Sequence, residues 1–132
     1  MFDNNRKNKH TLAAIPGFNV GHTIGSVVLK AKRYVDEVLV IDDGSTDDTV
    51  KVAEYAGAKV LRHKKNMGYG AAIQSCFRYA RENKFDVMVI IDGDAQHDAD
   101  FIPAVITDNS ADFMAADNIS GPVALLDGPA RI

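Results

Sequence analysis

Two aspartates, Asp92 and Asp94, follow an apolar run at 87–91 and are the clearest sign of chemistry in this chain. Asp-x-Asp spacing after a strand places two carboxylates in one small volume, where they repel each other unless a cation lies between them. Carboxylate oxygens suit Mg²⁺ or Mn²⁺, which usually keep open positions for phosphate oxygens. Gln96 would add an amide oxygen. The spacing predicts a divalent-metal site formed by Asp92, Asp94 and Gln96.

A capped turn is the simpler interpretation of the same two aspartates, since aspartate is common after strands. Gly93, between them, would let a ligand approach the backbone closely. An EF-hand loop is excluded, because His97 occupies the position of the required glycine and Pro103 that of the bidentate glutamate. The metal site and the capped turn remain the alternatives.

A second acidic cluster, Asp42 and Asp43, follows the apolar run 38–41. Ligands of open α/β sheets bind outside the carboxyl ends of the strands, so both acidic clusters are expected at one edge. The glycine-containing loop 68–70 opens a predicted helix, and its amides would meet a phosphate or simply allow tight packing. The full spacing of a dinucleotide fingerprint is missing.

Apolar runs of strand length alternate with stretches of helical spacing, which predicts the elements that carry these clusters. Ser45 is expected to cap the second helix and Gly57 to end it. Alternation of this kind indicates an α/β fold, a Rossmann-like three-layer α/β/α arrangement around a mainly parallel sheet. The expected strands are 12–15, 38–41, 59–61, 87–91 and 111–116, and the expected helices are 23–34, 45–56, 71–83 and 101–106.

The chain has 132 residues, enough for one domain. We expect a disordered arm at 1–10, the folded domain at 11–116 and an irregular tail at 117–132. Residues 1–91 carry 14 Lys and Arg against 10 Asp and Glu, whereas residues 92–132 carry one Arg against eight Asp. A phosphate ligand would fit near the basic part and a metal in the acidic part. No basic stripe with interleaved aromatics indicates nucleic-acid binding.

Five segments together resemble the nucleotide-sugar-binding half of GT-A glycosyltransferases of family 2, especially the polyprenyl-phosphate sugar transferases. They occur in family order across residues 12–106. The segments are Ala14-Ile15-Pro16-Gly17-Phe18-Asn19, Thr23-Ile24-Gly25, Val40-Ile41-Asp42-Asp43-Gly44-Ser45-Thr46-Asp47, Asn66-Met67-Gly68-Tyr69-Gly70-Ala71 and Asp92-Gly93-Asp94-Ala95-Gln96-His97.

This resemblance implies a role for each matching residue. Pro16 and Phe18 would lie against the nucleotide, while Ile41 and Asp43 would contact the base, Asp43 by accepting from a ring N–H. The remaining implied ligands bind the ribose side and the Mg²⁺ or Mn²⁺ ion; they are Asp92, Gly93, Asp94 and Gln96. The implied donor is a UDP- or GDP-linked sugar, and the implied acceptor is a lipid phosphate or a saccharide.

Two departures from the family pattern bear on activity. Val20 and Gly21 follow Asn19 where the family usually has acidic residues. The family's second half supplies the acceptor site and the general base, yet no Glu follows Glu82 and no Arg lies between residue 91 and Arg131. No general base is therefore assigned, and a nucleotide-sugar-binding module without turnover is the alternative to an enzyme.

Two other phosphate-handling classes share part of the acidic pattern. A haloacid-dehalogenase-type phosphatase would use Asp92 as nucleophile. A receiver domain would hold Mg²⁺ with Asp42 and Asp43 and would be phosphorylated on Asp92. Both classes need a lysine further along the chain than the last one, Lys84. No apolar run is long enough to span a bilayer, and residues 1–10 do not form a signal peptide. We expect a cytoplasmic protein, peripheral at the membrane if its acceptor is a lipid, and a homo-oligomer.

Overall fold

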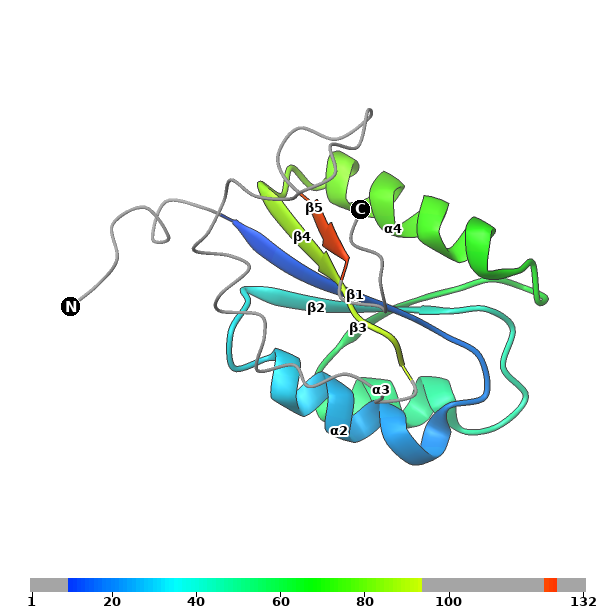
Figure 1. Ribbon diagram of the computed structural model, residues 1–132. Coiled ribbons are helices and arrows are strands. Elements are labelled where there is room, and N and C mark those ends of the chain that lie inside the picture. Colours follow the sequence, from blue (N-terminus) through cyan, green and yellow to red (C-terminus); the bar gives the residue numbers. More distant parts are fainter. Residues whose placement is uncertain (1–9, 94–122, 126–132) are drawn as a thin grey trace.

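The computed structural model describes residues 10–93 and 123–125. In this part the chain forms one five-stranded sheet in the order β3-β2-β1-β4-β5, and every neighbouring pair is parallel (Figure 1). The strands are β1 (Thr11–Gly17), β2 (Glu37–Asp42), β3 (Lys59–Arg62), β4 (Val87–Ile90) and β5 (Val123–Leu125). The helices are α2 (Gly21–Ala31), α3 (Thr49–Ala56) and α4 (Tyr69–Glu82).

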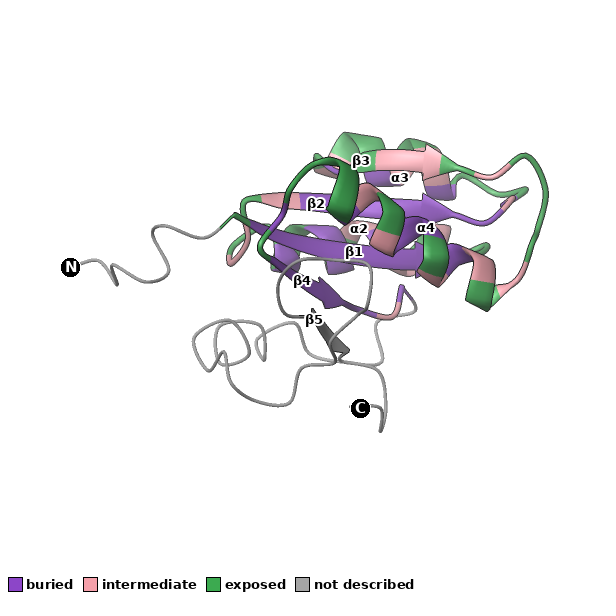
Figure 2. Ribbon diagram, turned by 90° about the horizontal axis from the view of Figure 1, so that it is seen from above, coloured by how far each residue is buried: buried purple, intermediate pink, exposed green. Residues whose placement is uncertain are grey.

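Helices cover both faces of the sheet, α2 and α3 on one face and α4 on the other (Figure 1). In β2, Val38 and Val40 pack towards α2 and α3, while Leu39 and Ile41 pack towards α4. This alternation explains the unbroken apolar run, because a strand between two helix layers is buried on both faces. Figure 2 shows β1, β2 and β4 buried between helices whose outer faces are exposed. The predicted three-layer α/β/α fold is confirmed.

The chain order fixes where a ligand site would lie. After β1, the chain runs outward through β2 and β3, and then α4 crosses the opposite face to bring β4 back beside β1. Connections leave in opposite directions at the carboxyl ends of β1 and β4, and such switch points are where ligands of open α/β sheets bind.

Three sequence predictions about element bounds are wrong. Ser45 does not cap α3, which begins at Thr49, because the Ser45 hydroxyl accepts from the Asn19 amide at 2.8 Å instead. His10, assigned to the disordered arm, is held by a ring stack on Phe85 with centroids 4.0 Å apart. The backbone of 123–125, assigned to the irregular tail, pairs with β4 as strand β5.

Other expectations were met or lie outside the described residues. Gly57 ends α3 with φ 104°, as predicted for a glycine that follows a helix. The predicted helix 101–106, the strand 111–116 and the arm 1–9 fall where the structure gives no description.

Burial on α2 gives a direct test of the packing. Replacing the fully buried Ile24 by alanine should lower the free energy of unfolding by about 2–5 kcal/mol, because a cavity is left beside the sheet. Leu29→Ala is the matched control, since this side chain is 57% exposed on the same helix and should change stability by less than about 0.5 kcal/mol. Urea denaturation of both variants measures the difference, and equal losses would contradict the packing of α2.

Candidate functional site

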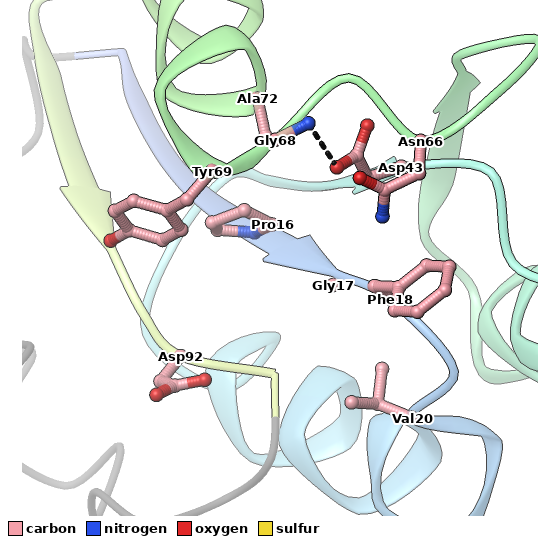
Figure 3. Close-up of a pocket in the computed structure, with 10 residues that line it drawn as sticks. All are labelled: Pro16, Gly17, Phe18, Val20, Asp43, Asn66, Gly68, Tyr69, Ala72 and Asp92. Carbon is pink, nitrogen blue, oxygen red and sulfur yellow. Dashed lines mark hydrogen bonds between the residues drawn. The ribbon is translucent and has the colours of Figure 1, made fainter.

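A pocket of about 360 Å³ opens at the carboxyl edge of the sheet, at the switch point between β1 and β4 (Figure 3). Five segments contribute to it: the end of β1 and the turn after it, the residue after β2, the β3–α4 loop, the first turn of α4, and the second residue beyond β4. The lining residues are Pro16, Gly17, Phe18, Val20, Asp43, Asn66, Gly68, Tyr69, Ala72 and Asp92.

Asp43 holds one end of the pocket together. Its Oδ1 lies 2.8 Å from His63 Nδ1 and accepts from the Met67 amide at 2.8 Å. Its Oδ2 accepts from the Gly68 amide at 2.9 Å (Figure 3). The side chain is 7% exposed. Burial alone would raise the pKa of Asp43, but the hydrogen bonds from His63, Met67 and Gly68 hold it below the ordinary value of 3.8.

His63 links Asp43 to helix α4. A carboxylate only accepts hydrogen bonds, so we assign the proton to His63 Nδ1, and Nε2 lies 2.8 Å from the Ser75 hydroxyl. Ser75 is buried in α4. The chain Asp43–His63–Ser75 therefore ties the end of β2, the residue after β3 and α4 together.

One amide of the glycine loop is already used inside the protein, because the Gly68 amide donates to Asp43. Neither Gly68 nor Gly70 is needed for tight packing, since nothing lies within 4 Å of a Cβ at either position. Gly44, with φ 83°, lets the two loops meet: a Cβ there would lie 2.5 Å from the Asn66 nitrogen.

Asn19 ties the turn after β1 to the β2–α3 loop. The backbone amide of Asn19 donates to Ser45 Oγ, and its side-chain oxygen Oδ1 accepts from the backbone amide of Thr46 at 2.8 Å. Asp47 continues the connection, because its carboxylate accepts from Gly21 at the start of α2 and from Thr49 at the start of α3. Phe18 and Val20 are thus carried on a turn that is fixed at both ends.

Asp42, at the carboxyl end of β2, contacts the loop after β2 and the end of β3 from within the core. It is fully buried, its Oδ2 accepts from the Ser45 amide at 3.2 Å, and Arg62 Nε lies 3.3 Å from the same oxygen. The other oxygen, Asp42 Oδ1, is buried and has no hydrogen-bond partner among the described residues.

Asp92 lines the other end of the pocket and is partly buried (Figure 3). Gly93 next to it is buried, and a Cβ there would lie 3.1 Å from the Pro16 carbonyl oxygen, so the close approach at this glycine is to β1. The Thr23 hydroxyl donates to the Gly93 carbonyl at 2.8 Å and fixes the end of β4 on α2. Asp94 and Gln96 lie outside the described residues.

Four of the predicted site residues come together around the pocket: Pro16, Phe18, Asp43 and Asp92. Ile41 does not line it, because its side chain is fully buried in the core under α4. Within residues 10–93 and 123–125, no group of three or more His, Cys, Asp or Glu side chains forms a ready metal site.

Sequence reasoning assigned no role to His63 and no site role to Asn66 or Tyr69, although the segment 66–71 was part of the family resemblance. His63 gave no signal, because its partners Asp43 and Ser75 are 20 and 12 residues away.

The comparisons with known proteins agree with this geometry. The family model described as "Glycosyl transferase family 2" matches residues 13–115. The chain belongs to glycosyl transferase family 2. The family predicted from the sequence is thereby confirmed.

Two of the named relatives have a lipid phosphate in their names. UDP-N-acetylglucosamine–dolichyl-phosphate N-acetylglucosaminyltransferase of Methanococcus voltae is 28% identical over 129 residues, which cover 82% of this chain and 51% of that protein. Undecaprenyl-phosphate mannosyltransferase of Micrococcus luteus is 30% identical over 102 residues, which cover 72% of this chain and 42% of that protein. The chain thus spans about half or less of these relatives.

A solved structure shows the same fold with ligands. Glucosyl-3-phosphoglycerate synthase from Mycobacterium tuberculosis, in complex with Mn²⁺, UDP-glucose and phosphoglyceric acid, superposes with a TM-score of 0.68 at 27% identity. The match covers 78% of this chain and 40% of that one.

None of the helices described here is long and apolar enough to cross a membrane.

The lowered pKa of Asp43 predicts a pH-dependent stability. The carboxylate stabilises the fold fully above its unfolded pKa of about 3.8, and the contribution is lost as pH falls through the lower folded pKa. Asp43→Asn should cost about 1–3 kcal/mol at pH 7, since charged hydrogen bonds are lost. Urea denaturation from pH 7 down to pH 3 should show this gap narrowing below about pH 4; a constant gap would contradict the network.

Gly44 offers a second test of the loop contact. Gly44→Ala should lower the free energy of unfolding by about 1–3 kcal/mol, because the backbone is left-handed and the new methyl group meets the Asn66 backbone. Gly70→Ala is the control, since nothing lies within 4 Å of a Cβ there. Thermal denaturation compares the two variants, and equal stability would mean that the loops do not meet at Gly44.

Proposed function

We propose that this family 2 domain binds a nucleotide-diphosphate sugar through a divalent metal, for glycosyl transfer to a lipid-phosphate or saccharide acceptor. The observation that carries the proposal is the pocket at the switch point, with a fixed carboxylate, Asp43, at one end and Asp92 at the other. A nucleoside needs apolar contact and hydrogen bonds, whereas a diphosphate needs compensating positive charge. The two ends of the pocket would meet these two needs separately.

The Asp43 end suits the nucleoside. Pro16 and Phe18 present ring faces beside it, and Phe18 is 45% exposed (Figure 3). A base lying against them would bury apolar surface and meet the Asp43 carboxylate at its polar edge. Because Asp43 is fixed by three donors, it is already oriented before any ligand arrives.

The Asp92 end suits the diphosphate and its metal. Asp92 is held at the end of β4 by the contact between Thr23 and Gly93, and Asp94 and Gln96 follow it in the chain. Asp92, Asp94 and Gln96 would hold Mg²⁺ or Mn²⁺, since carboxylate and amide oxygens are the donors these ions prefer. When bound, the ion would neutralise the negative charge of the diphosphate leaving group.

The acceptor and the oligomeric state belong to the same proposal. The lipid-phosphate relatives suggest an acceptor in a membrane, which would place the protein peripherally at the cytoplasmic face. Association into a homo-oligomer is tested by light scattering across concentrations, and a monomeric mass would exclude it.

Binding without turnover is the second candidate. It is considered separately because the chain spans only 51% and 42% of the two named relatives, so their transfer activity does not come to it directly. Incubation with a labelled nucleotide sugar and either a polyprenyl phosphate or a saccharide separates the two candidates: label on either acceptor shows transfer, and no label on both, in a chain that binds the donor, shows a binding module.

Calorimetric titration of UDP- and GDP-linked sugars with Mn²⁺ tests the binding itself. At least one should bind, and EDTA should abolish it. Asp92→Asn should weaken binding by at least about 10–100-fold, the cost of disturbing even the outer shell of a metal site.

Glu54→Gln is the matched control, because Glu54 is an exposed carboxylate on α3 and its removal should leave binding unchanged. Failure of both sugars to bind a folded chain would overturn the proposal. Equal affinity of wild type and Asp92→Asn would remove Asp92 from it.

A further inference from the structure

The first turn of α2 is joined to the end of β4 by a side-chain hydrogen bond. Thr23, the third residue of α2, donates its hydroxyl proton to the carbonyl oxygen of Gly93 at 2.8 Å. The two residues are 70 positions apart in the chain. The contact lies beside the pocket, because Val20, just before α2, and Asp92, just before Gly93, both line it.

The local partner that a threonine hydroxyl usually takes in a helix is already occupied at Thr23. Such a hydroxyl commonly bonds to a carbonyl three or four residues earlier. Three residues earlier is Val20, whose carbonyl oxygen lies 3.4 Å from the hydroxyl. That oxygen already accepts from the backbone amides of Thr23 at 3.0 Å and Ile24 at 2.8 Å, which use its two lone pairs. We therefore assign the hydroxyl proton to Gly93.

Gly93 is held from a second side by the end of β1. It is buried, and a Cβ there would lie 3.1 Å from the Pro16 carbonyl oxygen and 3.4 Å from Val20 Cγ2. Packing therefore fixes where Gly93 lies. Because glycine tolerates a wide range of backbone angles, packing alone does not fix the direction of its carbonyl group, and the Thr23 hydroxyl does so.

The direction of this carbonyl bears on the residues proposed to hold the metal. Gly93 stands between Asp92 and Asp94 in the sequence, and its carbonyl carbon is bonded to the backbone nitrogen of Asp94. A peptide bond is planar, so holding the carbonyl oxygen also sets the direction in which the chain continues. Asp94 itself lies outside the described residues.

We propose that Thr23 is a positioning residue for the divalent metal, which it does not touch. By holding the peptide between the two carboxylates, it orders them before the ion arrives, so that less conformational freedom is lost on binding. The inference rests on the proposed metal-dependent binding of a nucleotide sugar. It adds the residue that sets how much metal this binding needs.

Nucleotide binding as a function of Mn²⁺ concentration tests the proposal. Equilibrium dialysis of the full chain with UDP, and in a second series with GDP, gives the Mn²⁺ concentration for half-maximal binding. Thr23→Val keeps the shape of the side chain without the hydroxyl and should raise this concentration about 10–100-fold, the usual cost of losing an outer-shell partner of a metal site. Thr23→Ser keeps the hydroxyl and should stay close to wild type.

Thr11→Val is the matched control for a merely structural effect. The Thr11 hydroxyl is also engaged, donating to Asp36 Oδ2 at 3.0 Å, but Thr11 is the first residue of β1, at the opposite end of that strand from the pocket. Its loss should lower the urea midpoint and leave the Mn²⁺ requirement unchanged. Equal increases in the Mn²⁺ requirement for Thr11→Val and Thr23→Val would overturn the proposal.

The remaining outcomes separate this inference from the proposed function. An unchanged Mn²⁺ requirement in a folded Thr23→Val chain, or the same rise in Thr23→Ser, would overturn the inference and leave the proposed nucleotide-sugar site standing. Failure of the wild type to bind UDP or GDP, or binding that does not depend on Mn²⁺, would overturn both. Should Thr23→Val not fold, Thr23→Ala removes the same hydroxyl with a residue that favours helix.

Discussion

The carboxylate of Asp43 is the interaction on which the site depends. It stands one residue beyond β2, and its donors come from the residue after β3 and from the loop that leads into α4. Without it, two backbone amides and the imidazole of His63 would lose their acceptor, and the loop 63–68 would lose the hydrogen bonds that hold its conformation. The position of the pocket wall at Asn66, Gly68 and Tyr69 therefore depends on this one carboxylate.

A second set of hydrogen bonds does the same for the opposite wall. Asn19, in the left-handed region with φ 54°, holds the turn after β1 against the loop after β2. Asp47 then joins the first turns of two helices that lie on the same face of the sheet. The two loops that surround the pocket are therefore fixed by polar groups at the carboxyl edge, while the core fixes only the strands beneath them.

This division explains how much could be predicted from the sequence. Strands buried on both faces appear in the sequence as unbroken apolar runs, so β1, β2 and β4 were located to within a few residues. The edge strand β3 is only partly buried and was located from its short run Lys59-Val60-Leu61. Ser45 was misassigned because a serine before a helical stretch resembles a cap in any local window, and only the fold reveals that Asn19 lies beside it. Asp43 was recognised as a site residue, but its donors are 20–25 residues away in the chain, and no spacing rule connects them.

The distribution of charge across the pocket follows from these constraints. Asp43 is surrounded by donors that belong to the protein, so its negative charge is largely satisfied and it can serve recognition without attracting a cation. Asp92 lies across the pocket from Asp43. It is the first of eight Asp in residues 92–132, a part of the sequence that has a single Arg. Under the proposed function, Asp43 would contact the neutral base of a nucleoside diphosphate, and Asp92 would lie nearer its charged end. The pocket would then hold the ligand in one direction, because its two carboxylates stand at opposite ends.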